Sequence, residues 1–252
     1  MTNTQPLAEN IKERMSSSQD LESTQTSYRY VICSSPRSGS NYLCSILKSS
    51  GLAGHPLEYF NPQYIAANPS NAGKSAISIN TYISELEKRR TSSNGTFGIK
   101  IQFWQLRNFF NKKPEPAINF LRQQNQLIYL YRENKLEQAI SLYIARNTGA
   151  YTSADTRNLK PITFNGAALT ECLNLVIQDD VGWKSFLDKN SFPYLSLSYE
   201  DLVENTKAEI EKIWGAFGIT NAPQIIEKNL TQKLEHPQYQ DLLNQFKNFL
   251  GL

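Results

Sequence analysis

The sequence is poor in the residues that bind metals and form disulfides. It contains three cysteines, Cys33, Cys44 and Cys172, and two histidines, His55 and His236. The cysteines are odd in number and lack C-x-x-C spacing, so they predict neither a disulfide framework nor a zinc cluster. Two histidines cannot supply a site of several imidazoles, and they leave two candidates for histidine acid–base chemistry. We therefore expect a reducing compartment and no metal site.

Long hydrophobic runs are also missing. No segment approaches the roughly 20 consecutive apolar residues that a membrane-spanning helix needs. The N-terminus, MTNTQPLAENIKERMSSSQD, lacks the basic and then apolar order of a signal peptide. These absences predict a cytoplasmic protein with no membrane span. Hydrophobic residues still make up 40% of the 252 residues, which is enough to build a core.

The chain has only a small excess of one charge. Its net charge of +3 is too low to predict nucleic-acid binding. Residues 1–27 hold two basic and four acidic residues and carry −2, so the remaining chain carries +5, which suits a small anionic ligand. Because residues 1–27 are rich in Ser, Thr, Gln and Glu, we predict a disordered N-terminal tail with one nascent helix near residues 7–15.

Residues 28–252 alternate strand and helix patterns and are predicted as one domain. Short apolar, β-branched and aromatic runs suit buried strands at residues 28–35, 96–103, 126–132 and 192–201. Helical patterns cover residues 41–51, 79–90, 114–124, 134–149, 165–189, 202–217 and 239–250. Parallel neighbours need crossover connections, so strands separated by helices indicate an α/β fold with a central, mainly parallel sheet flanked by helices.

The first strand-turn-helix, VICSSPRSGSNYLCSIL, carries the most informative pattern. A turn rich in Ser, Pro and Gly before a helix presents backbone N–H groups and hydroxyls to an anion. A phosphate or sulfonate cradle is therefore predicted at Pro36, Arg37, Ser38, Gly39, Ser40 and Asn41. The same composition also fits an ordinary turn with a serine N-cap. No lysine follows Gly39, so the turn lacks the G-x-x-x-x-G-K-[ST] pattern and disfavours ATP hydrolysis.

Four segments in order resemble a known family. They are YVICSSPRSGSNYLCSILKSSGLAGHPLEYF, FGIKIQFWQL, LIYLYRENKLEQAISLYIARNTGAY and LSYEDLVENTKAEIEKIWGAFGI. Together they resemble the bacterial trehalose-sulfotransferase family and, more loosely, the sulfotransferases that use 3′-phosphoadenosine 5′-phosphosulfate (PAPS). The resemblance covers most of residues 28–220. It implies a P-loop NTPase-like sulfotransferase fold, PAPS as sulfuryl donor without a metal, a small saccharide acceptor, and a homodimer.

The resemblance implies a sulfuryl-donor site. Residues 36–41 would bind the 5′-phosphosulfate, with Arg37 neutralising charge on the leaving oxygens. Arg132 and Ser141 would bind the 3′-phosphate, and Tyr199 would contact the adenine. Nine residues separate Arg132 from Ser141, about half a circle on one helix, so Arg132 must lie on the strand end or turn before that helix. The alternatives are a surface ion pair for Arg132 and simple core packing for Tyr199.

The same resemblance implies the reacting groups. Glu58 matches the glutamate proposed as catalytic base, and a positioned carboxylate contributes about 10² to 10⁴-fold. His55 is the alternative base, and a lone loop glutamate is otherwise a solvated charge. Lys100, within a strand, either faces the site to stabilise the transferring group or reaches the surface with its ammonium. Lys233 is a candidate for a C-terminal loop that closes over the sulfuryl donor.

Three function classes remain open from the sequence. The first is a sulfotransferase that moves a sulfuryl group from PAPS to a carbohydrate hydroxyl by in-line displacement. The second is a small-molecule kinase with a degenerate phosphate loop, which would need magnesium and a nucleoside triphosphate. The third is a non-catalytic domain that keeps the fold and binds a partner through the same cleft. The family resemblance favours the sulfotransferase.

Overall fold

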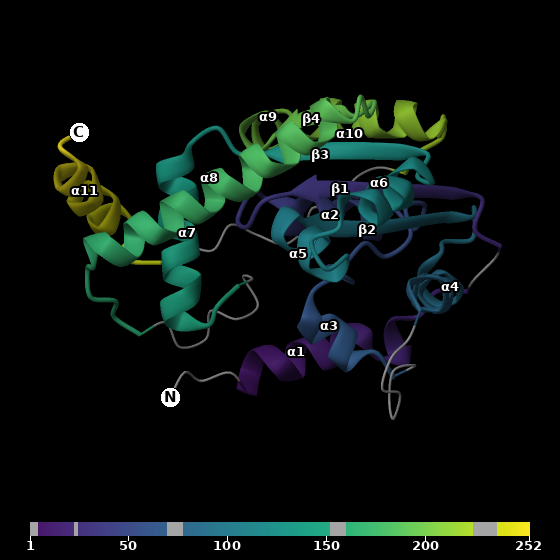
Figure 1. Ribbon diagram of the computed structural model, residues 1–252, viewed down its shortest axis with the longest axis horizontal. Coiled ribbons are helices and arrows are strands. Elements are labelled where there is room, and N and C mark those ends of the chain that lie inside the picture. The colour runs from purple at the N-terminus through teal and green to yellow at the C-terminus, as the bar shows by residue number, and fades with distance from the viewer. Residues whose placement is uncertain (1–4, 23–24, 70–77, 152–159, 224–235) are drawn as a thin grey trace.

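The centre of the molecule is a four-stranded sheet with the order β2-β1-β3-β4 (Figure 1). The computed structural model describes residues 5–22, 25–69, 78–151, 160–223 and 236–252. The strands are β1 Tyr28–Ser34, β2 Thr96–Gln102, β3 Gln126–Tyr131 and β4 Leu195–Ser198. Every neighbouring pair is parallel. This confirms the predicted α/β fold with a parallel sheet flanked by helices.

Helices connect the strands and extend beyond them. They are α1 Gln5–Met15, α2 Ser40–Ser49, α3 Pro62–Ala67, α4 Ile79–Arg90, α5 Phe103–Phe109, α6 Pro114–Arg122, α7 Lys135–Thr148, α8 Gly166–Lys189, α9 Tyr199–Glu204, α10 Thr206–Phe217 and α11 Tyr239–Leu250. Two short helices, α3 and α5, lie where the sequence pattern predicts none. The helix predicted at residues 202–217 is divided into α9 and α10 at Asn205, whose φ of −127° and ψ of 47° are not helical.

The two faces of the sheet pack against different helices. Val31 and Cys33 of β1 belong to a cluster with side chains of α4, α5, α6 and α8. Tyr30 and Ile32, which alternate with them, face a cluster that includes α2, α9 and α10. Both faces are therefore covered, as a parallel sheet requires. A third cluster joins α7, α8 and α11, at the end of the molecule that lies to the left in Figure 1.

The N-terminal segment differs from the predicted mobile tail. Residues 5–15 form α1, which lies beside α3 (Figure 1). Ile11 and Met15 are 4% and 0% exposed and join the core. Arg90, on α4, donates hydrogen bonds to the carbonyl oxygens of Ser16 and Gln19. Polar composition suggests disorder here, but this segment contacts the rest of the domain through two buried apolar side chains and a buried arginine.

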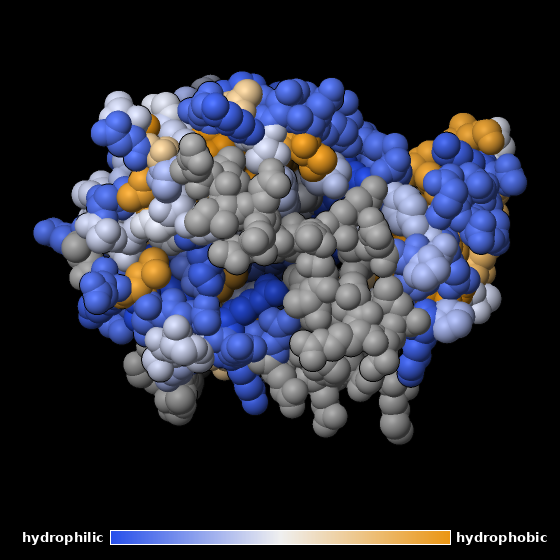
Figure 2. All heavy atoms as spheres, turned by 180° about the vertical axis from the view of Figure 1, so that it is seen from behind, coloured by the Kyte–Doolittle hydropathy of each residue, from blue (hydrophilic) through white to orange (hydrophobic). Residues whose placement is uncertain are grey.

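On the face drawn in Figure 2, hydrophilic residues cover most of the coloured surface, and apolar residues form small, separate patches. The large apolar side chains that are exposed come from α8, α9 and the C-terminal end: Ile177, Val181, Val203, Phe249 and Leu252. Single exposed apolar residues are ordinary on a folded protein. Among the described helices, none combines the length and the apolar character that a bilayer crossing requires.

Candidate active site

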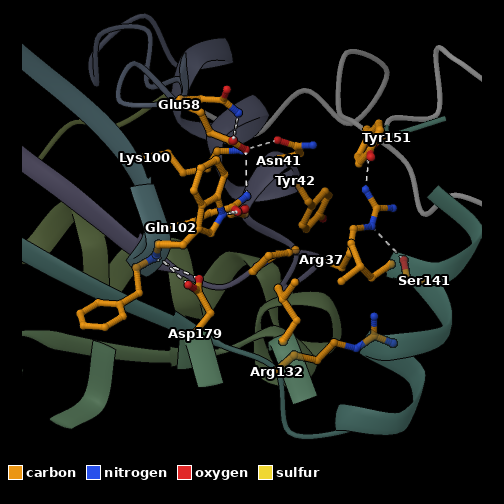
Figure 3. Close-up of a pocket in the computed structure, with 18 of the residues that line it drawn as sticks. Arg37, Asn41, Tyr42, Glu58, Lys100, Gln102, Arg132, Ser141, Tyr151 and Asp179 are labelled. Carbon is orange, nitrogen blue, oxygen red and sulfur yellow. Dashed lines mark hydrogen bonds and ion pairs between the residues drawn. The ribbon is translucent and has the colours of Figure 1, made fainter. Parts of the chain in front are cut away.

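A cavity of about 1220 Å³ opens where the four strands end. Because the strands are parallel, their carboxyl ends meet at one edge of the sheet, the usual place for ligands in open α/β folds. The cavity wall includes one residue that follows each strand: Pro36 after β1, Phe103 after β2, Arg132 after β3 and Tyr199 after β4. The topology thus brings together segments that are far apart in the sequence (Figure 3).

The turn between β1 and α2 is held in an unusual backbone conformation. Arg37 has φ 62° and Gly39, the N-cap of α2, has φ 81°. The buried side chain of Gln138 donates from Nε2 to Ser35 Oγ at 2.9 Å and to Pro36 O at 2.6 Å. A positive φ at a non-glycine residue persists only where surrounding contacts impose it. Gln138 on α7 is such a contact, and the sequence pattern did not reveal it.

Tyr199 closes against this turn from the other side. A Cβ atom on Gly39 would overlap Cδ2 of the Tyr199 ring, so a glycine is required for this approach. The guanidinium carbon of Arg132 lies 4.7 Å from the centre of the same ring. This distance is within cation–π range. The Tyr199 ring therefore lies between the turn that follows β1 and the guanidinium of Arg132.

Arg37 does not point back to its own turn. Its Nε donates to Ser141 Oγ at 3.0 Å, and its Nη1 donates to the carbonyl oxygen of Tyr151 at 2.5 Å (Figure 3). Burial, followed by the nearby charge of Arg132, lowers the pKa of Arg37 to about 10. The guanidinium remains charged at neutral pH. Ser141 thus contacts Arg37 in the structure, whereas the family resemblance pairs Ser141 with Arg132.

Arg132 is a nearly buried cation, only 4% exposed. Its Nη2 donates to Glu137 Oε2 at 2.7 Å, and its Nε lies 3.9 Å from Glu200 Oε1. No hydrogen-bond acceptor for this Nε occurs among the described residues. A buried donor without an acceptor costs about 1–3 kcal/mol, which an anionic ligand oxygen would recover. The ion pair with Glu137 therefore leaves Nε available for an anion.

Glu58 and Lys100 face each other because of how the chain runs along the sheet edge. The backbone N–H of Lys100, in the edge strand β2, donates to Leu57 O at 3.0 Å. This bond sets the next residue, Glu58, beside the lysine side chain, and Lys100 Nζ lies 2.8 Å from Glu58 Oε1. The side chains are 4% and 17% exposed. Lys100 Nζ also donates to Asn41 Oδ1 at 2.5 Å, which connects the pair to the turn.

The Glu58 carboxylate accepts from four side chains. Besides Lys100, these are Gln105 at 2.6 Å, Asn61 at 3.2 Å and Gln102 at 3.3 Å. Burial would raise the pKa of Glu58, but Lys100 and these hydrogen bonds outweigh burial and hold it below the usual value. Burial would likewise lower the pKa of Lys100, but Glu58 outweighs it and the pKa is raised. The pair is ionised at neutral pH.

Neither histidine borders the cavity. His55 is 4% exposed, and its Nδ1 lies 3.2 Å from Arg90 Nη1. Burial, followed by the charges of Lys48 and Arg90, lowers the pKa of His55 to about 3. His236 Nε2 lies 3.4 Å from the carbonyl oxygen of Lys160. The part of the chain that the structure describes holds no group of three or more His, Cys, Asp or Glu residues placed to bind a metal ion.

Asp179, on α8, is a cavity residue that the sequence does not suggest. Its carboxylate accepts from the backbone N–H groups of Phe103 at 3.0 Å and Trp104 at 2.7 Å, and so caps α5. Burial raises the pKa of Asp179 to about 7, although the two N–H groups oppose this effect. The Trp104 Nε1 then donates to Gln102 Oε1 at 2.5 Å. The sequence shows only an aspartate within a predicted helix, and its burial becomes apparent in the structure.

The cavity gathers almost every site residue expected from the sequence. The residues that line it are Pro36, Arg37, Gly39, Ser40, Asn41, Glu58, Lys100, Arg132, Ser141 and Tyr199. Ser38 is the exception, since it is buried and its Oγ donates to Ser35 O at 2.9 Å. Lys233 lies outside the described residues. Cavity residues that the sequence did not suggest include Asn10, Ile11 and Arg14 of α1.

This chain is similar to known proteins in fold and in sequence. Two of the solved structures with a similar fold have low sequence identity to it. The "Sulfotransferase Domain from the Synechococcus PCC 7002 Olefin Synthase" is 14% identical, with a TM-score of 0.45, over 79% of this chain and 75% of that one. The "Sulfotransferase Domain from the Curacin Biosynthetic Pathway" is 12% identical, with a TM-score of 0.45, over 90% and 99%. No curated protein matches. The sequence model of the Stf0 sulphotransferases matches residues 29–248, and the chain therefore belongs to the Stf0 sulphotransferase family.

Proposed function

We propose that this protein transfers a sulfuryl group from PAPS to a hydroxyl of a saccharide. The observation that carries the proposal is a cavity with two chemically distinct parts. One part holds the cations Arg37 and Arg132 beside the turn at the N-terminus of α2, and the other holds the Glu58–Lys100 pair. Membership in a sulphotransferase family supports a transferase. Pockets for single ligands measure about 300–1,000 Å³, so about 1220 Å³ leaves room for two substrates.

The residues of the first part fit a polyanionic nucleotide. Arg132 is buried and Arg37 is partly buried. Ser141 adds a hydroxyl beside Arg37. The orphaned Nε of Arg132 faces no protein acceptor in the described part of the chain, so a phosphate oxygen would satisfy it. Tyr199 lines the same part of the cavity, with its ring between Gly39 and Arg132, so the exposed edge of the ring can contact an adenine base. We assign these residues to the sulfuryl donor.

The second part fits the chemistry of a hydroxyl nucleophile. In the proposed displacement, the acceptor oxygen forms a bond to sulfur while the bond from sulfur to the donor phosphate oxygen breaks. Glu58 takes the hydroxyl proton. An acceptor hydroxyl would replace the longest of the four hydrogen bonds to Glu58, the one from Gln102 at 3.3 Å. Lys100 bridges Glu58 and Asn41, so its charge lies where negative charge develops on the transferring oxygens.

Binding of adenosine 3′,5′-bisphosphate, the desulfated product, tests the sulfuryl-donor assignment. We expect it to raise the melting temperature without a metal ion, because a ligand at 100 times its Kd stabilises by about 2.7 kcal/mol. Arg132→Gln and Arg37→Gln should each reduce this shift. Arg122→Gln, which removes an exposed arginine of α6 outside the cavity, is the matched control. A shift only with ATP and magnesium would contradict the proposal and favour the kinase.

A further inference from the structure

Helix α1 forms part of the cavity wall on the Glu58 side. Three of its residues, Asn10, Ile11 and Arg14, line the cavity. Arg14 Nη1 donates to the hydroxyl of Tyr64 at 3.4 Å, and Tyr64 lies on α3, the helix that follows the Glu58 loop. Burial raises the pKa of Tyr64. The charge of Arg14 lowers this pKa, and the charge of Glu58 raises it. Arg14 and Glu58 are therefore both close enough to Tyr64 to influence its hydroxyl.

The position of Arg14 is fixed by a clamp on the end of α1. Arg89 Nη2 donates to the carbonyl oxygen of Met15 at 2.7 Å, and Arg90 Nη2 donates to that of Arg14 at 3.2 Å. Arg90 is fully buried, and Asp20 pairs with both arginines, at 3.0 Å and 3.3 Å. Cations at a helix C-terminus satisfy its free carbonyl groups and interact favourably with the helix dipole. These contacts hold the C-terminal end of α1 against α4.

The charge of Arg14 has no counterpart in the described part of the protein. Arg89 and Arg90 pair with Asp20, and Lys100 pairs with Glu58. Among the side chains that the structure describes, which begin at Asn10, no carboxylate lies within 4.0 Å of the Arg14 guanidinium. The side chain is partly buried at the cavity wall. A partly desolvated cation attracts an anion more strongly than one in bulk water, because the local dielectric constant is lower. On the Glu58 side of the cavity wall, Arg14 is therefore a cation without a carboxylate partner among the side chains that the structure describes.

We infer that the acceptor carries a negative group as well as the hydroxyl to be sulfated, and that Arg14 binds this group. The inference rests on the proposed sulfotransferase function and narrows the acceptor to an acidic saccharide, either a sugar carboxylate or a sugar phosphate. Both present oxygens that a guanidinium binds with charge-assisted hydrogen bonds. The hydroxyl would reach Glu58 while the anionic group stays beside α1, so Arg14 determines specificity and takes no part in the proton transfer.

Calorimetric titration of the full chain, saturated with adenosine 3′,5′-bisphosphate, tests the inference. The ligands are glucose, glucuronate and glucose 6-phosphate, which share a ring and differ in charge. At least one anionic sugar should bind the wild type about tenfold more tightly than glucose, the effect of one charge-assisted hydrogen bond. The two anionic sugars distinguish a carboxylate from a phosphate. Arg14→Gln should abolish the preference, and Arg14→Lys should retain part of it.

Lys12→Gln is the matched control, because Lys12 lies on the same helix, is exposed and does not line the cavity. It changes the net charge equally and should leave the preference intact. The inference is overturned if glucose binds as tightly as both anionic sugars, or if Arg14→Gln keeps the preference. Failure of the bisphosphate to bind would instead refute the proposed function, and the same sugar titrations on the free chain would still decide the role of Arg14.

Discussion

Replacing Glu58 by glutamine keeps the shape of the side chain and removes its charge. Lys100 is 3% exposed, and breaking a buried ion pair costs about 3–5 kcal/mol. Glutamine also places an NH₂ group among side chains that now donate to Oε1 and Oε2, among them Gln105 at 2.6 Å. The variant should therefore melt earlier. Loss of a general base should lower kcat about 10² to 10⁴-fold, which equals about 3–5 kcal/mol of activation free energy.

Single-turnover transfer of labelled sulfate, measured well below the melting temperature of the variant, separates these two effects. The melting-temperature shift caused by adenosine 3′,5′-bisphosphate should persist in Glu58→Gln, because Glu58 is not assigned to the sulfuryl donor. Glu87→Gln is the control, since it breaks the Arg29–Glu87 ion pair at 2.6 Å outside the cavity. It should leave kcat unchanged. A Glu58→Gln rate within tenfold of the wild type would refute the role of Glu58 as base.

Three further changes have defined outcomes. Gly39→Ala should weaken bisphosphate binding and cost more stability than Gly218→Ala, because both have positive φ but only Gly39 contacts Tyr199; equal melting temperatures would contradict this. Asp179→Asn removes a carboxyl whose pKa is raised to about 7, so the free energy of unfolding of the wild type should fall relative to this variant as the pH rises from about 4 to 7, by at most about 1.4 kcal/mol per pH unit. A difference in melting temperature that stays constant over this pH range would argue against the raised pKa of Asp179. Arg90→Met should release α1 and speed proteolysis within residues 5–22, and unchanged cleavage there would show that the clamp is dispensable.

The sequence predicts those parts of the fold that depend on residues close together along the chain. Alternating apolar and β-branched runs place all four strands within a few residues, and α4 and α11 begin and end at the predicted residues. The turn after β1 is recognisable because its Ser, Gly and Arg residues are contiguous. Glu58 and Lys100 are 42 positions apart in the sequence, and only the family resemblance selected them before the sheet edge brought them together.

The features that the sequence does not predict depend on distant partners. Helix α1 has a polar composition, and Arg89 and Arg90, more than 70 positions away, bind backbone carbonyl groups at its C-terminal end. Asp179 caps α5 from a helix 75 or more positions away. The hydrogen bond from Arg37 to Ser141 depends on how α7 packs against the first turn, and spacing along a single helix cannot reveal it.

Transfer of labelled sulfate from PAPS to saccharide hydroxyls is the most direct test of the central claim. A panel that contains neutral and acidic sugars should yield a labelled sugar sulfate together with adenosine 3′,5′-bisphosphate. Product formation should fall at least about 10²-fold in Glu58→Gln. If the protein binds adenosine 3′,5′-bisphosphate but transfers no label to any sugar, the chain is a nucleotide-binding relative without saccharide sulfotransferase activity, and the account is contradicted.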